Sequence, residues 1–585
     1  MRRYHFPRWL SILPLMVLSS SLLHGQSTNV LTWRNNNWRD GENSTETTLT
    51  QMSVTSSKFG KICSTASGTI DGQIYAQPLV VTGGIPGYTH VVYLETMNDT
   101  VYAIDGDSTN CAVIYHISLL QSQEEAVQCH DVGAKQCPTF NPIIGILGTP
   151  VIDTSTSTMY VVTWTESTAG SCSTNRLPSC FVHRLHALNI ANGAEKYKGP
   201  VAIPSVTLEG STFSSIHHIQ RPGLLLLPKV EANGDSAVYV AFSEMDGTGA
   251  VGKNVPNGWV FSFDAQDLSV TPIAWTTTPN GEGGGIWMSG AGLAAGIDQT
   301  GGSSYIYVST GDGTFDVENG GSDYGDSFVK LTTSLAVSGY FTPYNQYCDD
   351  ITDNDLASGG VMLIPNGIGS NTIDFALANG KDGNIYVMDR ANPGGYQGPN
   401  LNTCPASGTN LNYETIPAST QGFFSTGAFW NQNLYFVAND SPLQKYEISG
   451  TACNPAPICT TPSASSSIRF PFGPVPVISS NNDITGTAIV WTIKGNGWPF
   501  QDHNLQPAPA VLYAFDAEHV MAPNILPELW NSVQCPTRDG AGNATKFAVP
   551  TVANGRVFMG TMDPTDLTNT RGQLDVYGAN SNPCN

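Results

Sequence analysis

The chain has 585 residues, only 12% of them charged, and its formal net charge is −22. A surface this acidic repels phosphate backbones and anionic lipid headgroups, which argues against binding to nucleic acids or to membrane surfaces. Gly, Ser, Thr, Asn and Pro are plentiful, which favours a turn-rich β protein.

Residues 1–25 have the organisation of a secretory signal peptide. The basic start MRRYHFPRW precedes an apolar stretch from Leu10 to Leu23, which is shorter than a membrane-spanning helix requires. No second apolar run of spanning length follows. We therefore expect a periplasmic or secreted protein whose mature chain has no integral membrane segment.

Twelve cysteines in an exported chain favour disulfides over thiolate metal sites. Three pairs lie close in sequence, and each is expected to staple a loop. These pairs are Cys129 with Cys137, Cys172 with Cys180, and Cys453 with Cys459. The chain has no CxxCH motif, so we expect no covalently bound haem.

A unit of three short strands recurs eight times along the chain. The first strand of each unit opens after Gly or Pro, at a spacing of roughly 50 to 75 residues that is typical of propeller blades with loop insertions. The eight openings are AQPLVV at Ala76, GTPVID at Gly148, RPGLLLL at Arg221, SGAGLAA at Ser289, SGGVMLI at Ser358, STGAFW at Ser425, FGPVPVI at Phe472 and AVPTVA at Ala548.

The second strand of each unit is aromatic and β-branched, as in VVYLET and MYVVTW, and the third often ends in Asp or Asn, as in TVYAIDG. Alternation with a period of two, with turn residues between the runs, indicates antiparallel meanders. The sequence therefore predicts an all-β fold, an eight-bladed β-propeller of four-stranded antiparallel blades.

The last unit has too few strands after Tyr577 to complete a blade. The segment from Trp33 to Thr65 carries apolar positions that suit the missing outer strand. We expect this N-terminal segment to close the ring, leaving only short protected edges. Residues 26–585 would then form a single propeller domain.

Familiar catalytic signatures are missing, since the chain has no HExxH, GxSxG or P-loop motif. The stretch from Gly281 to Asp316 is the most distinctive. Its glycine run GEGGG places Trp287 beside a small-residue strand, and a second strand ends in the turn TGDG at Asp312. Because glycines allow close backbone approach, a flat group could lie on this tryptophan.

Five motifs follow one another between about Tyr239 and Arg390: GGGIW, YVSTGDG, GDSFVKLT, FTPYNQ with the acidic CDDITDNDL, and KDGNIYVMDR. This ordered series resembles the quinoprotein alcohol dehydrogenases. The resemblance implies an eight-bladed propeller that binds pyrroloquinoline quinone and Ca²⁺ on its axis.

The resemblance also implies roles for single residues. Trp287 would be the floor on which the quinone stacks, and Lys381 would contact the quinone oxygens. Asp355 would be the catalytic base, with Asp353 and Asp349 as less favoured alternatives.

For the metal, Asp312 stands where the family has a metal-binding Asn, and a carboxylate suits Ca²⁺, which prefers hard oxygen ligands. Glu244 or Asp246, in FSEMDGTG, lies near the position of the family's metal-binding Glu. Each assignment has a structural alternative, because Trp287 could fill space between blades, and the segments at Asp312 and Lys381 read as ordinary turns.

The chain departs from the family pattern in two places. Many members carry adjacent cysteines beside the quinone, whereas Cys129-His130-Asp131 occupies that place here. The arginine that should follow and clamp a quinone carboxylate is absent from NPIIGILGTP, and Arg221 is the candidate substitute.

Two functions follow from these observations. The first is a quinone- and Ca²⁺-dependent oxidoreductase acting on small alcohols or sugars, in which the cofactor performs the hard chemistry. The second is a non-catalytic propeller with a degenerate cofactor site that binds a protein or a glycan. The acidic loops Asp312–Asp326 and Asp349–Asp355 also offer oxygen ligands for a structural Ca²⁺, with solvated turns as the simpler explanation.

Overall fold

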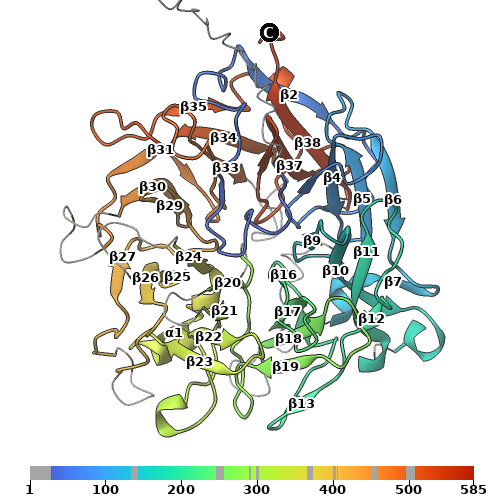
Figure 1. Cartoon of the computed structure of the whole chain (residues 1–585), viewed down its shortest axis with the longest axis vertical. Helices are drawn as coiled ribbons and strands as arrows, with labels where there is room; N and C mark the ends of the chain where they lie inside the picture. The colour runs from blue at the N-terminus through green and yellow to red at the C-terminus, as the bar shows by residue number, and fades with distance from the viewer. Residues whose placement is uncertain are drawn as a thin grey trace, which may run out of the picture.

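The structure is a computed structural model that describes residues 28–132, 142–175, 177–245, 256–288, 291–297, 302–364, 373–398, 404, 406–448, 453, 457–495, 508–568 and 570–584. Eight twisted antiparallel sheets surround a central axis, with the chain passing from blade to blade around the ring (Figure 1). The predicted eight-bladed β-propeller is confirmed.

The strands of the first four blades, from the axis outwards, are as follows: β3 (Leu79–Thr82), β4 (His90–Glu95), β5 (Thr100–Asp105) and β6 (Val113–Ser118); β9 (Val151–Asp153), β10 (Thr158–Ser167), β11 (Phe181–Asn189) and β12 (Val201–Ala202); β16 (Leu225–Leu227), β17 (Ala237–Glu244), β18 (Trp259–Asp264) and β19 (Ile273–Thr276); β20 (Ala294–Ile297), β21 (Ser304–Ser309), β22 (Phe328–Thr332) and β23 (Val337–Phe341).

The last four blades continue in the same order: β24 (Gly360–Leu363), β25 (Phe375–Asn379), β26 (Asn384–Asp389) and β27 (Glu414–Pro417); β28 (Ala428–Trp430), β29 (Asn433–Val437), β30 (Ser441–Glu447) and β31 (Ala464–Phe470); β32 (Val477–Ser479), β33 (Ile489–Gly495), β34 (Ala510–Asp516) and β35 (Glu528–Asn531); β36 (Thr551–Ala553), β37 (Arg556–Met562), β38 (Gly572–Ala579) and β2 (Phe59–Ser64). Every predicted opening segment contains or adjoins the first strand of a blade.

The remaining elements are short additions to this plan. They are β1 (Glu42–Asn43), β7 (Glu124–Gln128), β8 (Ile143–Ile144), β13 (Thr207–Leu208), β14 (Ser211–Thr212), β15 (His218–Ile219), the helices α1 (Gln346–Thr352) and α2 (Pro536–Asp539), and the 3₁₀ turns η1 (Cys129–Val132), η2 (Gly170–Ser173), η3 (Pro178–Cys180), η4 (Val317–Asn319) and η5 (Leu356–Ser358). In the described part of the chain, no helix is both long and apolar enough to cross a membrane.

Tyrosine side chains of the second strands form hydrogen bonds between neighbouring blades. In four blades a tyrosine of the second strand donates its hydroxyl to a carbonyl just after the third strand of the next blade. These bonds are Tyr93 to Ile190 at 2.9 Å, and Tyr160 to Ala265, Tyr239 to Thr333 at 2.8 Å each, and Tyr435 to Ala517 at 2.6 Å. Each ring thus fills the space between blades while its hydroxyl stays paired.

The last blade is completed by the N-terminal segment, as predicted. Strand β2 pairs antiparallel with β38, with Phe59 opposite Ala579 and Ser64 opposite Asp575. The ring of Phe59 also packs edge-on against Trp530 of the preceding blade, at a centroid distance of 4.9 Å. The outer strand of blade eight therefore precedes blade one in sequence, which closes the ring.

The sequence did not predict the course of residues 28–46, which run across the axis and bond to every blade in turn (Figure 1). In blade order the hydrogen bonds are Val30 N to Val80 O (2.8 Å), Ile152 N to Leu31 O (2.8 Å), Asn37 Nδ2 to Leu226 O (2.9 Å), Ala295 N to Asn37 O (2.7 Å), Leu363 N to Trp38 O (2.8 Å), Phe429 N to Asp40 O (2.8 Å), Ile478 N to Gly41 O (2.8 Å) and Asn43 Nδ2 to Val552 O (2.6 Å). We call residues 28–46 the axial segment.

Two buried arginines anchor the axial segment. Arg39 is fully buried and donates to the carbonyls of Trp33 at 2.7 Å, Leu293 at 2.8 Å and Leu224 at 3.0 Å. Arg34, equally buried, donates to the carbonyls of Gly427 and Thr426, just before the first strand of blade six. Because these carbonyls have their donor inside the protein, the axis needs no water to satisfy them.

Between described residues, five disulfides staple the loops and the chain end: Cys63–Cys111, Cys172–Cys180, Cys348–Cys404, Cys453–Cys459 and Cys535–Cys584. Two of these are predicted pairs. Cys129 is also disulfide-bonded, but its expected partner Cys137 lies outside the described residues. This number of disulfides is consistent with an oxidising compartment.

Arg39→Met keeps the apolar stem of the side chain but removes all of its donors, which leaves several buried carbonyls unpaired. We expect the free energy of unfolding, measured with urea, to fall by at least ~3 kcal/mol, since hydrogen bonds to charged groups contribute about 1.5–3 kcal/mol each. The exposed Arg571 gives a matched control in Arg571→Met. Equal effects of the two substitutions would contradict the anchoring role.

Candidate functional site

Glycines bring the two halves of the Gly281–Asp316 stretch into backbone contact. Gly284 N donates to Asp312 O at 2.5 Å, and Gly311 N donates to Gly285 O at 2.9 Å. A Cβ atom on Gly313 would lie 2.3 Å from Gly284 N, so no larger residue fits there. The contact fixes the turn that carries Asp312 against the loop that carries Trp287.

Trp287 is held by a buried carboxylate from the end of β17. Its Nε1 atom donates to Glu244 Oε1 at 2.9 Å, and Ser243 Oγ donates to Glu244 Oε2 at 3.0 Å. Gly285 makes room for this carboxylate, because a Cβ there would lie 1.5 Å from Glu244 Oε2. Burial, followed by the nearby charge of Asp355, raises the pKa of Glu244 to about 7.

The carboxylate of Asp355, from the turn before β24, lies beside Asp312 and Gly311. Its Oδ1 atom accepts the amide of Asp312 at 3.1 Å, and a Cβ on Gly311 would lie 2.2 Å from Asp355 Oδ1 and 3.3 Å from Trp287 Cδ1. The bare backbone of Gly311 therefore separates the carboxylate from the indole. The predicted base, the predicted stacking ring and the predicted metal ligand come together in space.

Lys381 completes this group with two ion pairs. Its Nζ atom lies 2.5 Å from Asp355 Oδ2 and 2.5 Å from Asp353 Oδ1, and its amide donates to Asp355 O at 3.0 Å. Burial works against the charge of Lys381, but Asp355 and Asp353 outweigh it and raise the pKa above its ordinary value. Asp353, a less favoured candidate for the base, thus lies at the site beside Asp355.

The carboxylates form a set that suits a hard cation. One oxygen from each of Asp312, Asp353 and Asp355 lies within 4.8 Å of the other two. Asp312 Oδ1 is buried and has no hydrogen-bond partner within the described structure, and burial, Asp355 and Asp326 raise the pKa of Asp312. A bound Ca²⁺ would supply the charge that these oxygens lack, so the donor set fits the ion.

Asp349 and Asp326 enlarge the acidic region behind this set. Burial, followed by Asp382, raises the pKa of Asp349 to about 8. Asp326 accepts the amide of Leu356, next to Asp355, at 3.4 Å, and burial, Asp355 and Asp349 raise its pKa well above the ordinary value. Asp246, the alternative to Glu244, lies outside the described residues.

Arg221 also lies at the site, but over the tryptophan ring. Its Cζ atom is 5.8 Å from the centroid of Trp287 and 4.9 Å from that of Phe547. Cys129 belongs to the apolar cluster against which Trp287 packs, close to where the family resemblance placed it. The guanidinium of Arg221 therefore lies over the face of Trp287 on which the expected quinone would stack.

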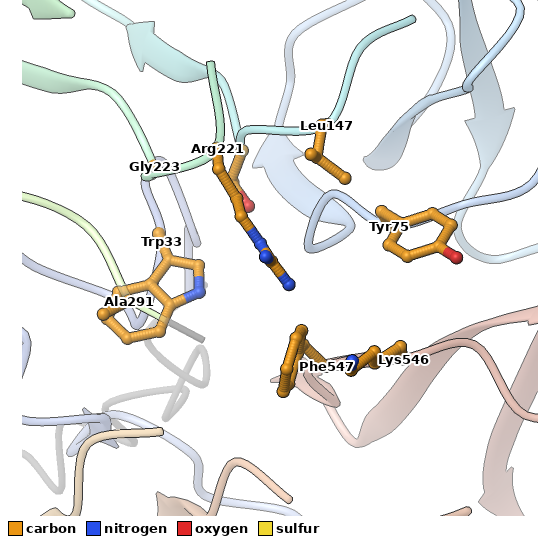
Figure 2. Close-up of a pocket in the computed structure, with 9 residues that line it drawn as sticks. Trp33, Tyr75, Leu147, Arg221, Gly223, Ala291, Lys546 and Phe547 are labelled. Carbon is orange, nitrogen blue, oxygen red and sulfur yellow. The ribbon is translucent and has the colours of Figure 1, made fainter. Parts of the chain in front are cut away.

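Next to Trp287 lies a small axial cavity of about 20 Å³, and Arg221 is the one lining residue that the sequence analysis selected as a site residue. Its lining residues are Trp33, Tyr75, Leu147, Thr149, Arg221, Gly223, Ala291, Lys546 and Phe547. Figure 2 shows the Arg221 side chain reaching into the centre, with Trp33 and Tyr75 on either side and Phe547 facing its tip.

Four of these residues occupy the same position in the blade repeat, and that position could have identified them from the sequence. Tyr75, Leu147, Arg221 and Phe547 each stand four residues before the first residue of an inner strand, β3, β9, β16 and β36 respectively. Aligning the blades on those strands therefore marks the side chains that border the cavity. Trp33 lies in the axial segment, outside the blade repeat, so an alignment of the blades does not mark it.

Comparison with known proteins identifies the fold but does not identify an activity. No protein-family model and no curated protein matches the sequence. Among solved structures, a europium-containing methanol dehydrogenase is similar over 94% of this chain and 98% of its own, with 14% identity and a TM-score of 0.53. This protein therefore has a quinoprotein dehydrogenase-like eight-bladed propeller fold.

Two other solved structures align less well. Sqt1 of Saccharomyces cerevisiae covers 90% of this chain and 100% of its own, with 7% identity and a TM-score of 0.42. BamB of Moraxella catarrhalis covers 89% and 99%, with 11% identity and a TM-score of 0.40.

The acidic set predicts a pH-dependent effect of Ca²⁺ on stability. A carboxyl whose pKa is raised by folding binds more protons in the folded than in the unfolded state, so its contribution to stability falls as the pH rises towards the folded pKa. For Glu244 and Asp349 this window extends from their ordinary values to about 7 and 8. Millimolar Ca²⁺ should therefore raise the melting temperature by several degrees at pH 8 and much less at pH 5.

Asp312→Asn gives the control for this measurement. The variant should lose most of the Ca²⁺ shift, and without Ca²⁺ it should melt higher than the unmodified protein at pH 8, because an unpaired buried carboxylate is removed. An equal Ca²⁺ shift at both pH values, or one retained in the variant, would count against a metal site.

Proposed function

We propose that this protein is a quinone-dependent oxidoreductase that uses pyrroloquinoline quinone and Ca²⁺ to oxidise small alcohols or sugars. The observation that carries the proposal is the convergence of Trp287, Glu244, Asp312, Asp355 and Lys381 around the bare backbone of Gly311. These residues come from three different blades, and a structural role for each one alone does not account for their meeting.

In this proposal each side chain has a distinct task. Trp287 offers a flat face, held in orientation by Glu244. Asp312 and Asp353, each with an oxygen within 4.8 Å of one on Asp355, would supply metal oxygens. Glu244 would add another, as the family resemblance implies, and Asp355 would accept the proton of the substrate hydroxyl. Lys381 holds Asp355 in place and adds positive charge beside it. The quinone, when bound, accepts the two electrons removed from the substrate.

The identity of the ion is part of the proposal. Oxygen ligands suit Ca²⁺, but three carboxylates close together also suit a cation of higher charge. The similar methanol dehydrogenase is described as containing europium. Both Ca²⁺ and Eu³⁺ are therefore tested below.

A second candidate function is a non-catalytic binding propeller. It is favoured by the position of Arg221, whose guanidinium lies over the Trp287 ring where a flat cofactor would stack. In that case the acidic set and the cavity are remnants, and the loops bind a protein or a glycan. Cofactor titration separates the two functions.

Titration with pyrroloquinoline quinone and millimolar Ca²⁺ or Eu³⁺ should quench tryptophan fluorescence saturably, and dye reduction should follow when alcohols or sugars are added. Trp287→Ala should abolish the quenching. Asp355→Asn should retain quinone binding but lower the turnover at least ~100-fold, the contribution expected of a general base.

Trp275→Phe and Asp267→Asn are controls in the outer part of blade three, and both should behave as the unmodified protein does. Absence of saturable quenching with either ion would overturn the oxidoreductase proposal and favour the binding propeller.

A further inference from the structure

Five aromatic side chains form a continuous row on the outer edge of blades three to five, where the outermost strands β19 and β23 lie next to each other (Figure 1). The ring of Tyr324 lies 6.4 Å from that of Trp275 on β19 and 5.5 Å from that of Tyr340 on β23, between ring centroids. Phe315 contacts Tyr340 at 6.2 Å and Tyr396, which follows β26, at 4.9 Å. We call these five residues the aromatic row.

Most of the aromatic row is accessible to solvent. Phe315 is buried and forms the base of the row, whereas the other four side chains are half-buried. In this the row differs from the tyrosines that join neighbouring blades, which are fully buried. Half-buried tyrosines and tryptophans, with an apolar ring and a polar tip, are typical of protein interfaces.

Exposed apolar side chains extend the row at both ends. Ile273 is 45% exposed and stands two residues from Trp275 on β19, so the two side chains share a face of the strand. Leu411 is 43% exposed, and its carbonyl would lie 2.4 Å from a Cβ atom on Gly394, two residues before Tyr396. An exposed apolar surface that spans several elements marks an interaction site.

Backbone hydrogen bonds hold the row in place. Tyr324 N donates to Thr277 O, just after β19, at 2.8 Å, and Gly395 N donates to Tyr340 O at 2.8 Å. Phe315 and Tyr324 also face each other across an antiparallel bridge within their loop. Because these rings are already positioned, a partner that binds them loses little entropy in ordering the surface.

The charges that act on the row within the described structure are negative. Burial, followed by the charge of Glu318, raises the pKa of Tyr340 and of Tyr396 above its ordinary value. Burial, Tyr340 and then Asp316 raise the pKa of Tyr324. Glu318 is exposed, so its carboxylate is available to a partner that contacts the rings. The electrostatic complement of this surface is a cation.

We propose that the aromatic row, with Glu318 and Asp316 beside it, is a docking surface for a polypeptide segment that carries exposed arginines. A guanidinium stacks on aromatic faces and bonds to a carboxylate through two parallel hydrogen bonds. A neutral glycan would gain nothing from the carboxylates, and an acidic partner is repelled by a chain of net charge −22. The proposal goes beyond the oxidoreductase function and does not depend on it.

The test is fluorescence anisotropy of a labelled hexa-arginine peptide titrated with the whole protein. The ionic strength is physiological, so that interactions between exposed charges more than about 8 Å apart are screened. Labelled hexa-lysine has the same charge, and labelled cellohexaose is a neutral glycan of similar length. We expect saturable binding of hexa-arginine, at least ~threefold weaker binding of hexa-lysine, and no detectable binding of the glycan.

Variants of the row locate the binding. Tyr324→Leu and Tyr340→Leu keep an apolar side chain but remove the ring, and each should weaken hexa-arginine binding at least ~threefold. Glu318→Gln should weaken it about twofold. The matched controls are Tyr88→Leu in blade one and Asp483→Asn in blade seven, both at exposed residues, and each should leave the affinity unchanged.

The outcomes are distinct. Hexa-arginine binding that weakens in the row variants and not in the controls supports the docking surface. Equal weakening in the controls indicates general attraction to an acidic protein and overturns the proposal, as does binding of cellohexaose without hexa-arginine, or no binding of any probe. Thermal unfolding identifies a leucine variant that fails to fold, and Glu318→Gln, at an exposed residue, then decides the test.

Discussion

The propeller depends on one constraint, which is that the backbone groups at the inner edges of eight separate sheets need hydrogen-bond partners. The axial segment forms a hydrogen bond with each blade through residues 28–46, and Arg39 and Arg34 donate to carbonyls next to blades three and six. Exposed strand edges otherwise invite unwanted pairing. The same segment delivers Trp33 to the axial cavity, so that ring closure and formation of the cavity depend on one stretch of chain.

The blades could be predicted because their signals are local. Alternation with a period of two and a turn after each strand depend on side chains that are neighbours in sequence, as in RVFMGT, which forms most of β37. The outer strand β2 was also predictable, because the last blade was visibly one strand short. The course of the axial segment was not, since its contacts are mainly backbone hydrogen bonds, which almost any sequence can make.

The residues proposed for the site stand in sequence motifs, but their arrangement in space could not be predicted from those motifs. Trp287, Asp312 and Lys381 stand in recognisable motifs, yet three aspartates were candidates for the base, and only folding brings Asp355 over Gly311. Lys546 stands in no recognisable motif. The charges that act on it, Arg221 and Lys381, come from blades that are distant in sequence. Alignment by structural repeat, rather than by motif, is what makes such axial positions visible.

The charges at the axis are separated in a way that links the two halves of the site. Asp312 carries a buried oxygen that has no donor among the described residues, and burial, followed by the charges of Arg221 and Lys381, lowers the pKa of Lys546 to about 7. Trp287 contacts both kinds of group, because its indole donates to Glu244 and the guanidinium of Arg221 lies over its ring. Trp287 is therefore the residue at which the acidic and the basic groups of the candidate site meet.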